Sequence, residues 1–358
     1  MIPLTVLDKE EVEKLLNLNL LSINKHPDLD IYILNYTPKT IYHKLWNSMT
    51  LACRGLVIDK DYNIIARSFP KFFNEFELKP EEIPYGEEFD VFKKMDGSLI
   101  LGFFYNDDWI ICSKGSFISD QAILSDKILD KSKLSYLDKK YTYTFELVGR
   151  DNRIVLDYGE NQLILLAAFE TQNGFEMLHE DLVQYYNHIF PIVEKININS
   201  LDELKSLPDN GNEEGYVIRF LNGFRMKWKF DSYLRLHRIV TNVSSKTIWE
   251  YLKNGENFEK MLEHVPDEFY NWVKTTKLDL ESKYSQIEKE ALLEFVDLYY
   301  YGNLVGRKEF AMVAKDNKYR SLLFAIYDHK KYDYIIWNMI KPDYEKPFAN
   351  GYDGDAET

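Results

Sequence analysis

Short apolar runs bounded by turn residues predict a β-rich first two-thirds of the chain. Two runs that flank a turn-like segment predict a hairpin, and a longer alternating or continuous apolar run predicts a single strand. The paired runs are residues 55–58 with 64–66 and 98–105 with 109–112, and the longer runs are 141–148 and 162–169. Asn-Gly, a strong hairpin signal, occurs at Asn173-Gly174 and at Asn222-Gly223, where it joins 214–220 to 224–229.

Apolar residues recur at helical spacing after His237, where proline and glycine also become rarer. Three groups each fall on one helix face: Phe269, Trp272, Val273 and Thr276; Leu292, Phe295, Val296 and Tyr299; and Leu322, Leu323, Ile326 and Tyr327. The patterns predict an α+β protein with a first domain over residues 1–240, built on antiparallel sheets. An all-helical domain is expected over 241–349, with the boundary near 238–243. The small, polar and acidic residues 350–358 predict a disordered tail.

Chain length and cysteine content limit the class of protein. The 358 residues favour two domains, because single cores rarely grow beyond about 250–300 residues. The longest apolar run, Leu163–Phe169, falls far short of the ~20 residues of a membrane-spanning helix, and the N-terminus lacks the order of a signal peptide. Two cysteines, Cys53 and Cys112, are too few for a disulfide framework. We therefore expect a cytoplasmic protein without a membrane partner, in the host cytoplasm if the chain is viral.

The net charge of −14 restricts how the protein can meet a nucleic acid. A negative chain attracts phosphate backbones weakly at long range, which argues against an architectural coat protein. Charges farther apart than about 8–10 Å are screened at physiological salt, so a local basic groove is still compatible with this composition. An enzyme with a focused positive site therefore fits the charge.

The segment Lys94-Met95-Asp96-Gly97-Ser98, directly before an apolar run, is the first candidate for chemistry. Alone it is a modest signal, since composition gives a chance match to Lys-x-Asp-Gly with a probability of roughly 5–10%. Four further pieces follow in order: Ser113-Lys114-Gly115-Ser116, Phe145-Glu146, Glu214-Gly215-Tyr216-Val217 and Lys227-Trp228-Lys229. Each piece is weak alone, and a lysine pair is more often a solvated strand face. The complete ordered set has no comparable structural explanation.

This ordered set resembles the covalent nucleotidyltransferases, which comprise ATP-dependent ligases and capping enzymes. Within them the chain is most similar to the tRNA-repair RNA ligases of T-even bacteriophages, the RNA ligase 1 type. Further matching phrases are Cys53-Arg54-Gly55, Lys71-Phe72-Phe73-Asn74 and Asn152-Arg153-Ile154-Val155, with Tyr233 and His237 following. The first two phrases select this branch over DNA ligases. The resemblance covers residues 1–240 and implies an ATP-grasp-like adenylyltransferase domain there.

The resemblance implies that Lys94 attacks the α-phosphorus of ATP and carries AMP. A lysine nucleophile must be neutral although its reference pKa is about 10.4, and nearby cations such as Lys227 and Lys229 disfavour its charged form. The other implied roles are α-phosphate contact for Lys227 and Lys229, pyrophosphate contact for Arg54 and Lys71, ribose contact for Glu146, ribose or phosphate contact for Lys114, and Mg²⁺ binding through water for Glu214. The expected cofactors are therefore ATP and Mg²⁺.

Other residues of the matching phrases have two interpretations each. Phe145 lies near the nucleoside or in the core, Arg153 contacts RNA or forms a local ion pair, and Tyr233 assists adenylate transfer or packs in the core. Asp96 is expected to turn its loop, Gly97 to supply a permissive backbone conformation, and His237 to be structural. Neither cysteine is expected to be catalytic, because a lysine already provides the nucleophile.

The implied reaction has three steps: AMP passes from ATP to Lys94, then to an RNA 5′-phosphate, and is released when a 3′-hydroxyl seals the strand. The expected partner is RNA with single-stranded ends, broken tRNA anticodon loops included, and a monomer is expected. Seven basic residues of the helical domain contact RNA backbone or form a solvated face: Arg307, Lys308, Lys315, Lys318, Arg320, Lys330 and Lys331. Two alternatives stay open, a DNA ligase or capping enzyme and a catalytically silent nucleotide- or RNA-binding module.

Overall fold

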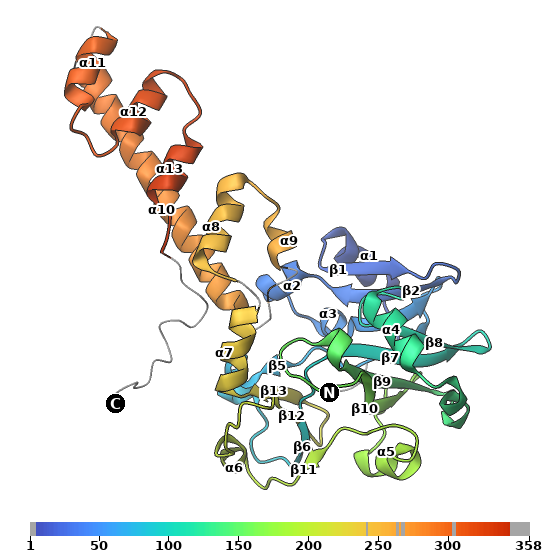
Figure 1. Cartoon of the computed structure of the whole chain (residues 1–358). Coiled ribbons are helices and arrows are strands. Elements are labelled where there is room, and N and C mark those ends of the chain that lie inside the picture. Colours follow the sequence, from blue (N-terminus) through green and yellow to red (C-terminus); the bar gives the residue numbers. More distant parts are fainter. Residues whose placement is uncertain (1–4, 241–242, 263–264, 266–268, 303–305, 344–358) are drawn as a thin grey trace. The chain divides into compact units, whose positions relative to one another are not determined.

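The computed structural model of the chain describes residues 5–240, 243–262, 265, 269–302 and 306–343. The chain falls into two units, Met1–Val240 and Thr241–Thr358, each with its own internal contacts. Figure 1 labels their helices and strands along the chain. The predicted acidic tail at 350–358 lies outside the described residues.

Three sheets form the framework of the first unit. In spatial order, the first holds β1 (Leu21–Lys25), β2 (Ile31–Tyr36), β3 (Arg54–Asp59) and β4 (Ile64–Ala66); the second holds β10 (Gln162–Glu170), β9 (Tyr141–Val148), β7 (Ser98–Tyr105) and β8 (Asp108–Ser113); the third holds β11 (Lys195–Ile196), β6 (Phe89–Lys93), β12 (Gly215–Phe220), β13 (Arg225–Lys229) and β5 (Phe73–Asn74). Neighbouring strands are antiparallel, except that β5 runs parallel to β13. The α+β prediction with antiparallel sheets is confirmed.

Short helices and 3₁₀ turns connect these strands. They are α1 (Lys9–Asn17), α2 (Pro38–Tyr42), α3 (Ser48–Ala52), α4 (Asp120–Ile128), α5 (His179–Tyr186), α6 (Leu201–Lys205), α7 (Asp231–Val240), η1 (Glu75–Glu77), η2 (Pro80–Glu82), η3 (Lys131–Tyr136) and η4 (Arg150–Asn152). Capping residues set several starts: the Asp8 carboxylate accepts from the backbone N–H groups of Glu10 and Glu11, and Pro38 occupies the first turn of α2.

Strand alternation decides which side chains of the second sheet are buried in the core. Tyr143, Phe145 and Leu147 of β9 point to one face and pack in a cluster with Leu182 and Phe190, which follow from α5 onward. Residues at the even positions of β9 point to the opposite face. This arrangement directs the side chain of Glu146 away from that core.

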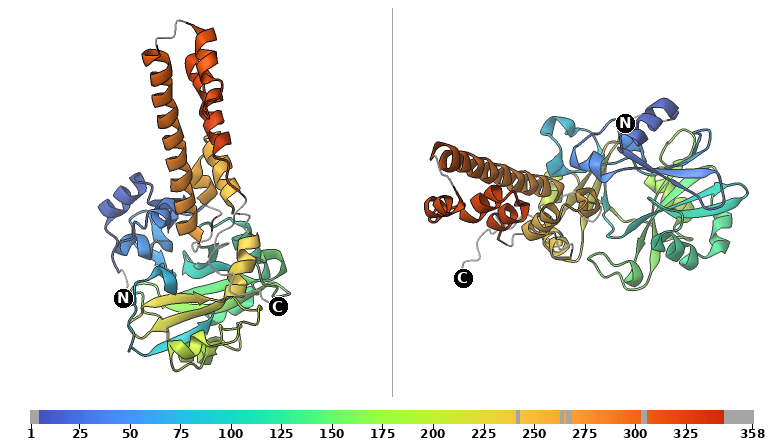
Figure 2. Two further views of the ribbon diagram at one scale, coloured as in Figure 1. Left: turned by 90° about the vertical axis from the view of Figure 1, so that its left-hand side faces the viewer. Right: turned by 90° about the horizontal axis from the view of Figure 1, so that it is seen from above.

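Helices and their connections, without any strand, make up the described residues of the second unit. It contains α8 (Ser245–Asn254), α9 (Phe258–Leu262), α10 (Tyr270–Val296), the π-helical turn η6 (Asp297–Tyr301), α11 (Arg307–Ala314), α12 (Arg320–Tyr327) and α13 (Asp333–Met339). Figure 2 shows α12 and α13 running beside the long α10, where Ala291, Phe310 and Leu323 are fully buried. The predicted faces with Val273 and with Leu322 and Leu323 are confirmed, since these residues are buried. The face with Leu292 and Val296 was wrong: both are exposed (41% and 38%), and α10 buries Ala291 there instead. Among the described helices, none combines the length and apolar character needed to cross a membrane.

Candidate functional site

The side chain of Lys94 lies against Glu214 at the junction of β6 and β12. Lys94 follows the last residue of β6, and its backbone N–H donates to the carbonyl of Gly215 at 2.8 Å. Its Nζ donates to Glu214 Oε2 at 2.8 Å, and Lys229 Nζ lies 3.0 Å from Glu214 Oε1. The Glu214 side chain is 3% exposed. A buried carboxylate therefore bridges two of the predicted catalytic lysines.

The charge of Glu214 depends on these two lysines. Burial by itself raises the pKa of a carboxyl group, but the ammonium groups of Lys94 and Lys229 hold the pKa of Glu214 below its usual value. Glu214 is therefore an anion in this arrangement. A carboxylate that is kept ionised is a ligand that Mg²⁺ accepts in proteins.

Backbone geometry explains why a glycine follows Glu214. Gly215 has φ +143°, and a Cβ at this position would lie 2.1 Å from the carbonyl oxygen of Trp228 on the neighbouring β13. The same pairing sets Gly215 opposite Lys229 and Val217 opposite Lys227. Because Lys227 and Lys229 are two residues apart on one strand, their side chains leave the same face of the sheet. Lys227 is also buried.

The loop after Lys94 is anchored by Asp96. Its Oδ2 accepts from the backbone N–H groups of Val155 at 2.9 Å and Leu156 at 2.7 Å, and its Oδ1 accepts from the Tyr233 hydroxyl at 2.7 Å. Asp96 thus shapes the loop, as expected. Tyr233 is 1% exposed in the core of the third sheet, which favours the packing interpretation of this tyrosine.

Gly97 was predicted to supply a permissive backbone conformation, and this prediction was wrong. Its backbone does not lie in the left-handed region, so conformational permissiveness is not what requires a glycine. A Cβ at Gly97 would lie 2.2 Å from the Leu147 carbonyl oxygen of β9. The close approach of two backbones requires the glycine instead, because any side chain would separate the strands.

Glu146 and Phe145 leave β9 on opposite faces. Phe145 is 1% exposed in the core cluster with Phe190, so its placement near a nucleoside was wrong and its core interpretation is confirmed. Glu146 lines a cavity together with Lys94 and Arg54. Burial raises the pKa of Glu146 to about 7, the nearby Lys94 opposes this rise, and the Glu214 carboxylate adds to it.

This first cavity lies between the second and third sheets and has a volume of about 100 Å³. Polar groups of Arg54, Lys94 and Glu146 line it beside apolar side chains that include Phe92, Met95 and Leu166. The Arg54 guanidinium stands 5.6 Å from the Phe72 ring, and its Nη1 is buried without a hydrogen-bond partner among the described residues. An unsatisfied buried cation is costly, so this nitrogen is suited to an anionic ligand.

Lys71 and Lys114 meet around Tyr36, which the sequence prediction did not include. Their Nζ atoms lie 5.6 Å and 5.4 Å from the centre of the Tyr36 ring. Asn35 holds the neighbouring segments together: Gly55 N–H donates to its Oδ1 at 3.0 Å, and its Nδ2 donates to the Lys114 carbonyl at 2.7 Å. Neither lysine belongs to the described lining of the first cavity. A strand over Ile31–Tyr36 was not predicted, so no signal pointed to Asn35 or Tyr36.

The remaining predicted residues have local partners. Arg153 Nη1 lies 3.4 Å from Asp157 Oδ2, which favours the ion-pair interpretation. The His237 ring packs against the Tyr233 ring at 5.4 Å, as a structural residue does. Burial raises the pKa of the Cys53 thiol to about 12 and also raises that of Cys112, so neither thiol is an accessible nucleophile.

Three of the seven basic residues singled out in the second unit form ion pairs within it. Arg307 lies 3.0 Å and Lys330 3.2 Å from Asp328, and Lys318 lies 2.9 Å from Glu290. These pairs fit a solvated helix face. Contact of this unit with RNA remains a prediction.

The comparisons with known proteins reported below all match RNA ligases. The model of a family described as RNA ligase matches residues 52–234, just over half of the chain. A bifunctional polynucleotide kinase/RNA ligase of Autographa californica nuclear polyhedrosis virus is 27% identical over 66% of this chain, which spans only 38% of that longer protein. An RNA ligase of Rhodothermus phage RM378 is 25% identical, over 84% of this chain and 85% of its own length. The structure of an archaeal ATP-dependent RNA ligase has a TM-score of 0.50 at 15% identity, covering 78% and 80% of the two chains, and shows a shared fold.

Proposed function

The chain belongs to the RNA ligase family, and from this membership we propose that it joins RNA ends at the expense of ATP through an AMP adduct on Lys94. One observation carries the proposal. Lys94 Nζ, Glu214 and Lys229 Nζ form a continuous ion-paired group, and Lys94 also lines a cavity with Glu146 and Arg54. The candidate nucleophile, the candidate phosphate-binding cations and a cavity that Lys94 lines therefore adjoin one another, which supports the proposal.

The chemistry begins with a change of partner for Lys94. In the described state its Nζ donates to Glu214, so the amine must leave this carboxylate and give up a proton before it can attack. A P–N bond then forms to the α-phosphorus of ATP while the bond to pyrophosphate breaks. Lys227 and Lys229 stabilise the negative charge on the α-phosphate, and Arg54 contacts the departing pyrophosphate.

Two transfers complete the reaction. An oxygen of the RNA 5′-phosphate displaces Lys94 from the AMP phosphorus, which restores the amine and leaves a 5′-5′ pyrophosphate on the RNA. The 3′-hydroxyl of the second end then attacks the RNA phosphorus, and AMP leaves. Each step exchanges one bond at phosphorus for another, so the same cations serve all three.

A divalent cation, Mg²⁺ in our proposal, fits the donor set of this site. No group of three or more His, Cys, Asp or Glu side chains suited to a metal occurs among the described residues, which excludes an all-protein cage there. Mg²⁺ is commonly held by one or two carboxylates with water and substrate phosphates, and the buried Glu214 anion offers one such ligand. The ion would supply charge neutralisation at the phosphates.

We further propose that the RNA substrate has single-stranded ends, which include broken tRNA anticodon loops. A family of RNA ligases requires an RNA with a 5′-phosphate and a 3′-hydroxyl, whereas the loop context is supported only by the resemblance to phage tRNA-repair ligases. The same basis supports a monomer acting in the cytoplasm.

Covalent labelling tests the proposal directly. The wild-type chain incubated with ATP labelled on the α-phosphate and Mg²⁺ should retain label through denaturing electrophoresis. Lys94→Ala should lose all label because the acceptor amine is gone. Lys94→Arg is the matched control, since it keeps a cation for Glu214 yet lacks the nucleophile, and it should also stay unlabelled while folding normally.

The second half of the experiment addresses the substrate. Adding 5′-phosphorylated single-stranded RNA should discharge the label and produce circular or joined RNA, with the equivalent DNA strand in parallel. Label that persists on the Lys94→Ala variant would refute the role of Lys94. Faster joining of DNA than of RNA would favour the DNA ligase alternative.

A further inference from the structure

A second cavity lies beside the first one in the same unit. It is open to solvent and has a volume of about 540 Å³. Its lining comes from α3, from the segment after β4 and from two hairpin turns. Glu176, Arg219 and Arg225 line both cavities, so this group forms a shared wall. None of the sequence predictions assigned a role to this cavity.

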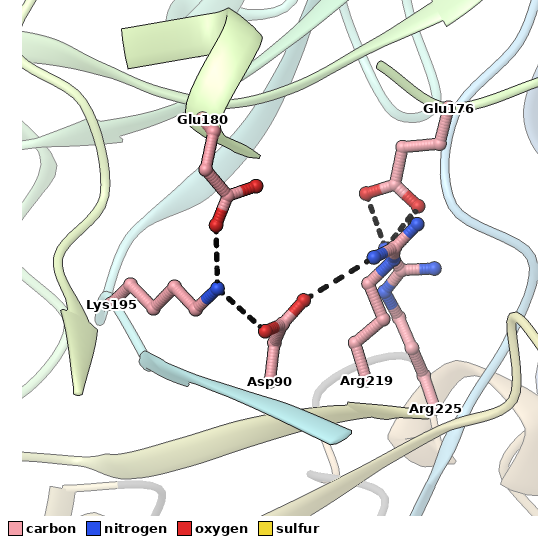
Figure 3. A network of polar contacts seen from close by, with 6 residues as sticks. All are labelled: Asp90, Glu176, Glu180, Lys195, Arg219 and Arg225. Carbon is pink, nitrogen blue, oxygen red and sulfur yellow. Dashed lines mark hydrogen bonds and ion pairs between the residues drawn. The ribbon is translucent and has the colours of Figure 1, made fainter. Parts of the chain in front are cut away.

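The shared wall carries more positive than negative charge. Figure 3 shows Glu176 beside the two guanidinium groups, with Asp90 on the far side of Arg219. Glu176 accepts from Arg219 Nε at 3.0 Å and from Arg225 Nη2, and Arg219 Nη1 lies 3.4 Å from Asp90. Arg67, whose pKa burial lowers to about 10, also lines the second cavity. Three arginines thus face this cavity with one carboxylate.

Several donors of the second cavity have no acceptor within the described part of the chain. A guanidinium has five N–H donors, and the described contacts use only Nη2 of Arg225, which leaves its Nε and Nη1. Ser68, which is 7% exposed, lines the same cavity with a buried hydroxyl that has no hydrogen-bond partner among the described residues. A buried hydroxyl without an acceptor is rare in folded proteins. An anionic oxygen would satisfy the Ser68 hydroxyl and could also accept from the remaining Arg225 N–H groups.

Exposed apolar side chains stand at the rim of the second cavity. Phe175 is 65% exposed and Leu221 is 62% exposed, although both line the cavity. They lie beside the Asn173-Gly174 and Asn222-Gly223 turns. An exposed aromatic ring next to arginines is the combination with which proteins hold single-stranded nucleic acids, the ring for a base and the cations for phosphate.

We propose that the second cavity binds a nucleotide of the RNA strand, with a backbone phosphate on its arginines and Ser68 and a base against Phe175. The inference rests on the proposed function and names a part of its substrate site. The shared wall of Glu176, Arg219 and Arg225 places this nucleotide next to the first cavity, where AMP is transferred. A strand held there would present its neighbouring nucleotides to the reaction.

Binding of a short, fluorescently labelled, 5′-phosphorylated single-stranded RNA tests the inference by anisotropy. Phe175→Ala should raise the Kd on the order of tenfold, because stacking of a base contributes about 1–3 kcal/mol. Ser68→Asp should raise the Kd for the same RNA by placing an anion among the phosphate-binding donors. Tyr136→Ala is the matched control: Tyr136 is 66% exposed, outside both cavities, and the Kd should not change.

Labelling with ATP, which needs no RNA, separates the two proposals. Absence of an AMP adduct on the wild type would overturn the proposed function. Normal labelling together with an unchanged RNA Kd in Phe175→Ala would overturn only the proposal that the second cavity binds RNA. Because Phe175 is exposed, this variant keeps the test valid even if Ser68→Asp does not fold. Competition identifies the preferred ligand. If AMP or inorganic phosphate displaced RNA from the wild type at a concentration equal to that of the RNA, the proposal for the second cavity would also be overturned, because a nucleotide of the strand would not be the preferred ligand.

Discussion

At the residue scale, the Glu214 carboxylate pairs with two lysines of the candidate site. The sequence suggested that Lys94 would have cations as neighbours, but the structure places the Glu214 carboxylate between Lys94 and Lys229. In the reaction we propose, Lys94 leaves this ion pair before it attacks ATP, and phosphates and a divalent cation would compete for the carboxylate. Under this proposal, binding of the ligands would redistribute these charges and activate the amine.

Glu146 gives a pH-dependent prediction at this scale. Burial raises its folded pKa to about 7 from an ordinary 4.5, so between these values the unfolded chain releases a proton that the folded chain retains. Stability is lost as the pH rises through this window, and the loss is complete above pH 7. Glu146→Gln removes the ionisation and should stabilise the protein relative to wild type by about 1–3 kcal/mol more at pH 8 than at pH 5.

Denaturant unfolding of both proteins at the two pH values measures this difference. Thr144→Val is a suitable control, since Thr144 is a buried neighbour on the same strand without an ionisable group. Its stability relative to wild type should not vary with pH. A Glu146→Gln difference that is constant between pH 5 and pH 8 would show that Glu146 is ionised throughout.

At the element scale, strand pairing turns separate sequence phrases into one site. The β6–β12–β13 ladder brings residues around positions 94, 214 and 229 together, although they are far apart in the chain. Local periodicity was enough to predict β7 with β8, and β12 with β13, because a hairpin is closed by its own turn. It did not predict β2 or β5, whose place depends on partners distant in sequence.

The ionic network of Figure 3 joins the third sheet to the Glu176 hairpin and to α5, and its two ends should differ in importance. Glu176 is 15% exposed and accepts from two arginines, so Glu176→Ala leaves two poorly solvated cations without their shared partner. We expect a loss of about 3 kcal/mol of unfolding free energy.

Glu180→Ala is the comparison within the same network. Glu180 is 66% exposed and pairs with Lys195, which also keeps Asp90 as a partner at 2.7 Å. Its removal should cost less than about 1 kcal/mol. Thermal or denaturant unfolding of the two variants measures both values, and equal losses would contradict the role given to burial.

At the scale of the whole molecule, every residue assigned to the chemistry lies in the unit Met1–Val240. The helical unit has its own buried core around α10 and α12. The chain has a net charge of −14, while Lys71 and Lys227 are buried and Arg54 and Lys94 line the first cavity. Adenylyl transfer should therefore depend on the first unit alone, and the proposed contribution of the second unit is to RNA selection.

A chain that ends at Val240 tests whether adenylyl transfer needs only the first unit. It should still form the AMP adduct, because its sheets and cavities contain Lys94, Glu146, Glu214 and Lys229. Joining of RNA should fall relative to the full chain if the helical unit contacts the substrate. Circular dichroism controls for folding, and a folded fragment without adduct would show that the helical unit is required for the first step.

The sequence by itself determined the local elements and the family. Runs such as 98–105 and 141–148 became strands because alternation and turns act between near neighbours, and the ordered phrases from Arg54 to Lys229 identified the ligase relationship. Only the tertiary structure decided which side chains meet: that Phe145 enters the core, that Glu214 separates Lys94 from Lys229, and that distant arginines share a second cavity. Such contacts depend on strand order and register between remote segments, which no local pattern encodes.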